Sequence, residues 1–156
     1  MSTPTVVPSA KLTAATNGVP SLELCNIYAV RRAARWLTQI YDQYLARVGL
    51  TSTQFTILAL IDKADHLTIL QLSDALKMDR TSLVRTLKPL RLSGYIDAFK
   101  VSQSSKLLMM SLTAEGASKL EASLPEWEGA QLEINNRWGG EKAEQLRKDL
   151  YELTSS

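Results

Sequence analysis

The 156-residue sequence contains a single cysteine, Cys25, and a single histidine, His66. One cysteine excludes a disulfide within the chain and a cysteine-rich zinc site. Paired carboxylates, a nucleophilic triad and a glycine-rich phosphate loop are also missing. The sequence therefore predicts a binding protein rather than an enzyme, and it indicates no metal and no cofactor.

Long apolar runs are absent as well. No stretch reaches the 18 or more apolar residues of a membrane-spanning helix, so no contact with a membrane is expected. Segment 1–20 is rich in Ser, Thr, Ala and Pro and lacks the charged start and apolar run of a signal peptide, so we expect a disordered tail and a cytoplasmic location. Hydrophobic residues make up 45% of the chain, which is enough for a core.

Charge is unevenly distributed, although the net charge is only +2. Residues 77–106 hold seven Lys or Arg against two Asp or Glu, whereas residues 113–156 hold five against nine. A basic segment by itself is most often a solvated face. This one coincides with a recognisable motif, and a module that contacts phosphates is expected to be basic.

The motif is a helix-turn-helix followed by a β-hairpin. We expect helices at 68–76 and 79–93, a turn at 77–78, and strands at 95–101 and 107–112. Such a winged helix places its second helix in a DNA major groove. The pattern therefore predicts sequence-specific binding to double-stranded DNA.

Further helices flank this lobe. Apolar spacing and capping residues predict helices at 21–48, 52–61, 113–138 and 141–153. The expected fold is mainly α with a small β-hairpin wing. It consists of a winged helix-turn-helix lobe at 49–113 and a helical dimerisation region at 21–48 and 114–156.

The end helices carry more apolar surface than a small winged helix can cover. The residues concerned are Leu22, Cys25, Leu132, Ile134, Trp138, Leu146, Leu150 and Leu153. Packing within one chain is one explanation. A homodimer is the other, and we prefer it because it presents two recognition helices to successive major grooves, about 34 Å apart, on a palindromic operator.

Five segments in this order resemble the MarR (multiple antibiotic resistance regulator) family of bacterial transcription factors. They are 49–55 (GLTSTQF), 71–76 (QLSDAL), 78–85 (MDRTSLVR), 90–96 (LRLSGYI) and 112–116 (LTAEG). The resemblance implies a triangular homodimer that acts as a repressor and is released by a small ligand or by oxidation. One position departs from the family, whose wing usually carries Asp-x-Arg where this chain has Ser104 and Lys106. Lysine is the more strongly hydrated cation, which predicts either weaker minor-groove contacts or preferred sites that are less A·T-rich.

Asp79 is expected to cap the recognition helix rather than contact DNA. Arg85 can make two hydrogen bonds to a guanine edge, and Lys88 lies further along, where phosphates are the better partner. The full set of predicted DNA-binding residues is Arg80, Thr81, Ser82, Arg85, Thr86, Lys88, Lys100 and Lys106.

The sequence offers two ways in which the protein could sense a signal, a ligand pocket and a thiol. A small-molecule effector, aromatic or phenolic, is expected in a pocket formed by Arg32, Trp36, Tyr41, Tyr44, Phe55 and Trp127, although aromatic residues at helical spacing are more often core. Cys25 lies at a place similar to that of the reactive thiol in the hydroperoxide-sensing branch of the family, although Tyr28 falls one residue early and Tyr41 lies further from Cys25 than the branch's tyrosines do. A cysteine on an apolar helix stripe is more often a packing residue, which we prefer.

The competing functional class is a winged helix that binds another protein and not DNA. Such modules tend to lose the basic residues of the second helix. Arg80, Arg85 and Lys88 argue against this alternative.

Overall fold

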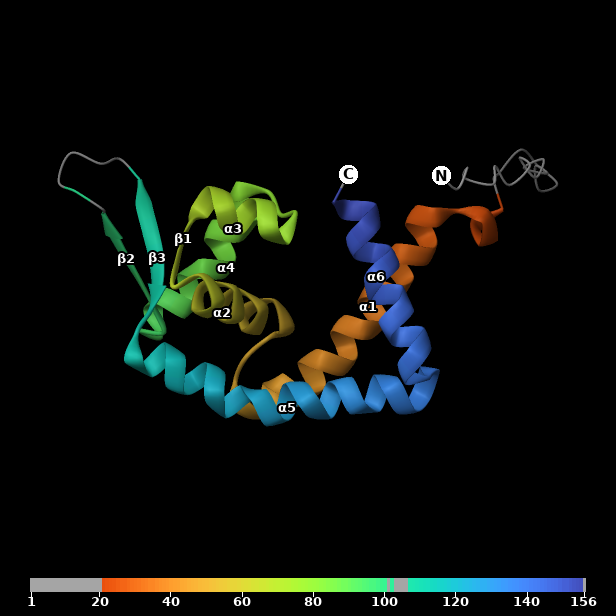
Figure 1. Ribbon diagram of the computed structural model, residues 1–156. Coiled ribbons are helices and arrows are strands. Elements are labelled where there is room, and N and C mark those ends of the chain that lie inside the picture. The colour runs from red at the N-terminus through yellow and green to blue at the C-terminus, as the bar shows by residue number, and fades with distance from the viewer. Residues whose placement is uncertain (1–20, 101, 103–106, 156) are drawn as a thin grey trace, which may run out of the picture. The chain divides into compact units, whose positions relative to one another are not determined.

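The computed structural model describes residues 21–100, 102 and 107–155 (Figure 1). The predicted tail at 1–20 and the wing positions Ser104 and Lys106 lie outside the described residues. The chain divides into two units, Met1–Leu37 and Thr38–Ser156, which we describe separately. No single helix in the described residues is long and apolar enough to cross a membrane. Two consecutive helical segments, 26–48 and 52–64, together have the length and composition of a membrane span, but they are bent by 75° where they join.

The first unit contains a short 3₁₀ helix, η1 (Leu22–Leu24), and the beginning of α1 (Asn26–Leu45). The single helix predicted over 21–48 is therefore wrong at both ends. Cys25 has extended backbone angles that separate η1 from α1, and residues 46–48 tighten into a second 3₁₀ helix, η2 (Ala46–Val48). Gly49 then closes the segment with φ +70°, a left-handed conformation that favours glycine.

In the second unit, three N-caps set the starts of helices; those at Thr51 and Asp79 are predicted from the sequence, whereas Thr68 is predicted as the first helical residue and is the cap. Thr51 and Thr68 each form a capping box with the glutamine three residues later, and Asp79 accepts a hydrogen bond from the Ser82 amide. The helices that follow the caps are α2 (Ser52–Ala64), α3 (Ile69–Leu76) and α4 (Arg80–Leu92), and α2 is one turn longer than predicted.

The wing is a three-stranded antiparallel sheet in the order β1-β3-β2 (Figure 1). Its strands are β1 (His66–Thr68), β2 (Ile96–Lys100) and β3 (Leu108–Leu112). Strand β1 pairs Leu67 with Met110, and β2 pairs Ala98 with the same residue. The structure thus confirms the two wing strands and adds a third from the segment before α3.

One hydrophobic core unites α2, α3, α4 and the sheet. It includes Ile57, Leu58, Ile61, Leu72, Leu83, Leu87, Leu90, Ile96 and Met110, each no more than 3% exposed. Leu83, Leu87 and Leu90 face this core from α4, as their three- and four-residue spacing predicts. Burial of that stripe directs the opposite face of α4 to solvent.

Two further helices follow the wing, α5 (Ala114–Trp138) and α6 (Gly140–Thr154), separated by Gly139 with φ +103°. The prediction that Ile134 needs a partner chain is wrong, because Ile134 is 4% exposed within the chain. Cys25 and Leu146 are half-buried. Leu132, Trp138 and Leu153 remain exposed, as do Leu22 and Leu150.

The end of α4 is attached to the start of α5. The Thr113 hydroxyl donates to the Gly94 carbonyl at 2.6 Å and accepts the Gly116 amide at 3.0 Å. The Thr113 amide donates to the Tyr95 carbonyl at 3.1 Å. A Cβ at Gly116 would lie 1.9 Å from that same carbonyl oxygen. Only glycine therefore allows α5 to begin this close to the turn that follows the recognition helix.

Candidate nucleic-acid interface

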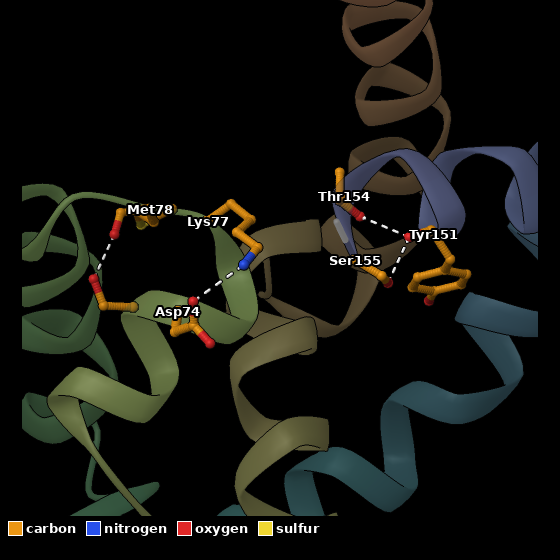
Figure 2. A network of polar contacts seen from close by, with 7 residues as sticks. Asp74, Lys77, Met78, Tyr151, Thr154 and Ser155 are labelled. Carbon is orange, nitrogen blue, oxygen red and sulfur yellow. Dashed lines mark hydrogen bonds and ion pairs between the residues drawn. The ribbon is translucent and has the colours of Figure 1, made fainter.

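The turn between α3 and α4 fixes how the recognition helix is presented. Lys77 adopts a left-handed conformation with φ 48° and ψ 40°, and its amide donates to the Asp74 carbonyl. Figure 2 shows the ion pair between the Lys77 ammonium and the Asp74 carboxylate, 3.1 Å apart. The Ser73 hydroxyl also donates to the Met78 carbonyl. These local contacts hold the two helices in a helix-turn-helix geometry.

Asp79 caps α4 and does not reach outward. Hydrogen bonds from the Ser82 side chain and backbone amide lower the pKa of the Asp79 carboxyl below its ordinary value. A carboxylate at this end also complements the positive end of the helix dipole. The residues after Asp79 are consequently the ones free to meet a ligand.

The solvent face of α4 carries the predicted DNA-binding residues. Arg80, Thr81, Arg85 and Lys88 are exposed. Ser82 and Thr86 are half-buried, and the Thr86 hydroxyl donates to the Ser82 carbonyl at 3.0 Å. Thr86 can therefore offer DNA its hydroxyl oxygen as an acceptor and its methyl group. Lys100 is exposed at the end of β2 and Lys106 lies outside the described residues.

The basic residues of α4 are left without acidic neighbours. Within the described part of the chain, Arg47, Lys77, Arg137 and Lys148 form ion pairs with Glu126, Asp74, Glu133 and Glu144. No described acidic residue pairs in this way with Arg80, Arg85, Lys88 or Arg91. Unneutralised cations on one exposed helix face create the positive potential that attracts phosphates.

Comparison with known proteins decides the family. The sequence model of the MarR family matches residues 48–102. An uncharacterised HTH-type transcriptional regulator of Bacillus cereus is 32% identical over 116 residues, 74% of each chain. The chain belongs to the MarR family. The organic hydroperoxide resistance transcriptional regulator of Bacillus subtilis is 26% identical over 131 residues, 84% of this chain and 86% of the relative.

A solved MarR-like structure extends the similarity to the whole fold. The transcriptional regulator MosR of M. tuberculosis, crystallised in complex with DNA, is 34% identical to this chain. The match covers 84% of this chain and 94% of MosR, with a TM-score of 0.73. Family membership and the winged helix-turn-helix together identify a DNA-binding transcriptional regulator, and the relatives' role is regulatory rather than enzymatic.

The residues predicted for an effector pocket are described unit by unit, in the surroundings that each of them has. Phe55 is 8% exposed and stacks on Trp127 with ring centroids 6.1 Å apart, so Phe55 is a core residue. Tyr44 lies against Gly129, and its hydrogen bond with Glu133 raises the pKa of the phenol. Arg32 and Trp36 are exposed on the part of α1 that belongs to the first unit.

Tyr41 and Trp127 do meet in a hollow of about 800 Å³ between α1, α5 and α6. Burial raises the pKa of Tyr41, and the nearby Arg147 guanidinium lowers it in part. The carbonyl oxygen of the Asn135 side chain is buried and lacks a hydrogen-bond partner among the described residues. Arg147 on α6 and Asn135 on α5 were missed from the sequence, because neither helix carries a motif that indicates which of its faces lines the hollow.

At the C-terminal end of α6, the hydroxyls of Thr154 and Ser155 both donate to the Tyr151 carbonyl (Figure 2). These bonds satisfy a carbonyl that a helix end would otherwise leave open. Tyr151, which also lines the hollow, is 72% exposed.

The cap at Asp79 gives a prediction about pH. Because the folded-state pKa is lowered, the cap contributes its full stability above the ordinary aspartate pKa and loses it as pH falls through the folded-state pKa. Asp79→Asn keeps a capping side chain but cannot titrate. Thermal unfolding across the acidic range should therefore show a smaller loss of stability for the variant than for the parent. Parallel curves for the two proteins would contradict the role given to Asp79.

Proposed function

We propose that this regulator binds an imperfect palindromic operator as a homodimer and represses transcription until a small effector releases it. The observation that carries the proposal is the exposed face of α4, where Arg80, Arg85 and Lys88 lack acidic partners among the described residues. Hydroxyl groups of Thr81 and Thr86 accompany these cations. Cations and hydroxyls on the first turns of a recognition helix read base edges and phosphates in the major groove. The protein would act in the cytoplasm, where the operator lies.

The experiment that tests this function is selection of bound duplexes from a random DNA pool with the purified protein. The expected product is a two-part site whose halves are related by an inverted repeat and lie one helical turn apart. Selection with the Arg80→Ala, Arg85→Ala double variant is the control and should enrich the site weakly or not at all. Failure of the parent protein to enrich any sequence would contradict the proposal.

Dimerisation is proposed for 21–48 and 114–156, with 49–113 as the DNA-binding lobe. The proposal is supported by large apolar side chains that α6 and the end of α5 leave in solvent, among them Leu132, Tyr151 and Leu153 at 61%, 72% and 67% exposure. Exposed apolar surface of this extent is typical of an interface.

A dimer makes a direct prediction about mass. Sedimentation at micromolar concentration should report about twice 17.3 kDa. Leu132→Glu combined with Leu153→Glu should shift the protein towards monomer, because each places a charge in the proposed interface. Leu70→Glu, at a residue that is 76% exposed on α3, is the matched control and should stay dimeric. A monomeric parent would contradict the architecture.

Release by an aromatic or phenolic effector is proposed for the hollow between α1, α5 and α6. Support comes from the half-buried rings of Tyr41 and Trp127 and from the Arg147 guanidinium, which together suit an aromatic body with a negative or polar substituent.

Oxidation of Cys25 is the alternative mechanism of release from DNA. The sequence similarity to an organic hydroperoxide resistance regulator favours it. We propose instead that Cys25 packs, because it is half-buried between η1 and α1, and its carbonyl accepts the Ala29 amide. Cys25→Ser should then bind the selected operator like the parent, and stoichiometric organic hydroperoxide should leave both complexes intact. Mass spectrometry that shows Cys25 oxidised in step with loss of DNA would reverse this assignment.

A further inference from the structure

The connection between α1 and α2 is a tight corner within the second unit. The Gly49 amide donates to the Ala46 carbonyl at 3.0 Å. The Leu50 amide donates to the Leu45 carbonyl, also at 3.0 Å. Two such bonds around a left-handed glycine form a Schellman motif, which ends a helix in a defined turn. Thr51 follows at once as the N-cap of α2, so the corner contains no flexible linker.

Asp42, close to the end of α1, bridges this corner to the start of α2. The Ser52 amide donates to the Asp42 Oδ1 at 2.7 Å, and both residues are half-buried. Ser52 is the first residue of α2, so its amide has no partner within that helix. The Thr51 hydroxyl accepts a different amide, that of Gln54. Helix α2 therefore takes its N-cap from its own sequence and one further hydrogen bond from α1.

The bond from Asp42 is directional, whereas the apolar contacts at the same corner are not. Leu45 and Leu50 are buried in the core, and Tyr41 and Val48 pack against it. Burial of apolar surface is favourable in any direction. A hydrogen bond weakens steeply when donor, hydrogen and acceptor depart from a line, and a charged acceptor makes it stronger. The Asp42 carboxylate therefore favours one orientation of α2 on the end of α1.

The orientation of α2 decides the orientation of the recognition helix. Ile57 and Ile61 of α2 share one buried core with Leu87 of α4, so a rotation of α2 against the end of α1 carries α4 with it. In the proposed homodimer, α1 belongs to the dimerisation region. The separation of the two recognition helices, and with it the separation of the half-sites that they fit, then depends on this corner in each subunit.

We propose that Asp42 is a positioning residue for DNA recognition, which sets the half-site spacing that the dimer accepts by holding the Ser52 amide. The inference rests on the proposed function, because only a dimer on a two-part operator has a spacing to select. Arg47 lies at the same corner and pairs with Glu126 of α5 at 3.1 Å, but its side chain is 62% exposed. An exposed ion pair contributes little, so the role is assigned to Asp42 and not to Arg47.

The experiment compares affinity for the selected operator with affinity for operators that have one base pair added or removed at the centre. Each change moves the half-sites by about 3.4 Å and rotates them by about 34°. The parent should prefer the original spacing. Asp42→Ala should lower this preference, measured as the ratio of affinities, by about tenfold, because a hydrogen bond to a charged acceptor is lost. A variant that is merely less stable would bind every operator less well and keep the ratio.

Matched variants test the bond from both of its ends. Asp42→Asn keeps an oxygen that can accept the Ser52 amide and should keep most of the preference. Ser52→Pro removes the donor at the first helical position, where proline is tolerated, and should lower the preference as Asp42→Ala does. The extended backbone of Thr51 suits the residue before a proline. The double variant should lose no more than either single variant, because both remove the same bond. Arg47→Ala is the control and should keep the parental preference.

Three results would overturn the role of Asp42. They are a parental spacing preference in Asp42→Ala, additive losses in the double variant, and an equal loss of preference in Arg47→Ala. A dimeric parent that binds every spacing equally would also exclude the role. A parent that binds none of the operators would overturn the proposed function, and this inference with it.

Discussion

Arg85→Ala is expected to weaken binding to the selected operator by about 1–3 kcal/mol, roughly 5- to 150-fold, and to relax the preference at one base position. Arg85 lies on the exposed face of α4, and no described acidic residue holds its guanidinium. A guanidinium at this point can donate two hydrogen bonds to a guanine edge, which alanine cannot replace.

The measurement is a binding titration at fixed salt against the operator and against variants of it at each position. Arg137→Ala is the matched control, because Arg137 is exposed on α5 and already pairs with Glu133 at 2.6 Å. That variant should keep parental affinity. Unchanged affinity and base preference in Arg85→Ala would mean that another residue of α4 reads the base.

Gly116→Ala is expected to destabilise the protein by about 1–3 kcal/mol, although alanine normally favours a helix over glycine. The reason is the Tyr95 carbonyl, whose oxygen would lie 1.9 Å from the new Cβ. The start of α5 or the turn after α4 must move to make room, and the hydrogen bonds of Thr113 at this junction would weaken.

Gly140→Ala provides the control at the first position of α6. Its Cβ would approach nothing closer than 4.0 Å, so alanine should be neutral or slightly stabilising there. Thermal unfolding of the two variants and the parent measures whether each alanine lowers or raises the stability. All three proteins are compared at one concentration, because the unfolding of a dimer depends on its concentration. Equal melting temperatures for Gly116→Ala and the parent would contradict the close approach of α5 to Tyr95.

Features that depend on neighbours in the sequence could be predicted from the sequence. Thr51 and Asp79 cap their helices, and Gly94 ends the recognition helix with φ +72°, as the spacing indicates. A capping side chain bonds to backbone groups within three residues of it. Tertiary packing therefore has little influence on where such a helix begins. The same locality explains why the exposed and buried faces of α4 follow from its apolar spacing.

Features that depend on long-range packing could not be predicted in this way. Ile134 is apolar at a helical spacing, and that pattern cannot distinguish burial within the chain from burial against a second chain. Phe55 is in the core because Trp127, more than 70 positions later, stacks on it. Val84 on α4 and Leu108 on β3 line one groove because of the register of β3, and hydrophobic periodicity does not give that register.

The most direct test of the central claim is dimethyl sulfate interference on the selected operator, since methylation of guanine N7 blocks the major-groove edge that α4 is proposed to read. Interference is predicted at guanines in two half-sites one helical turn apart on one side of the duplex, and Arg85→Ala should remove it at one guanine in each half-site. An operator that tolerates methylation at every major-groove guanine, or interference unchanged in the variant, would contradict recognition of DNA by this face of α4.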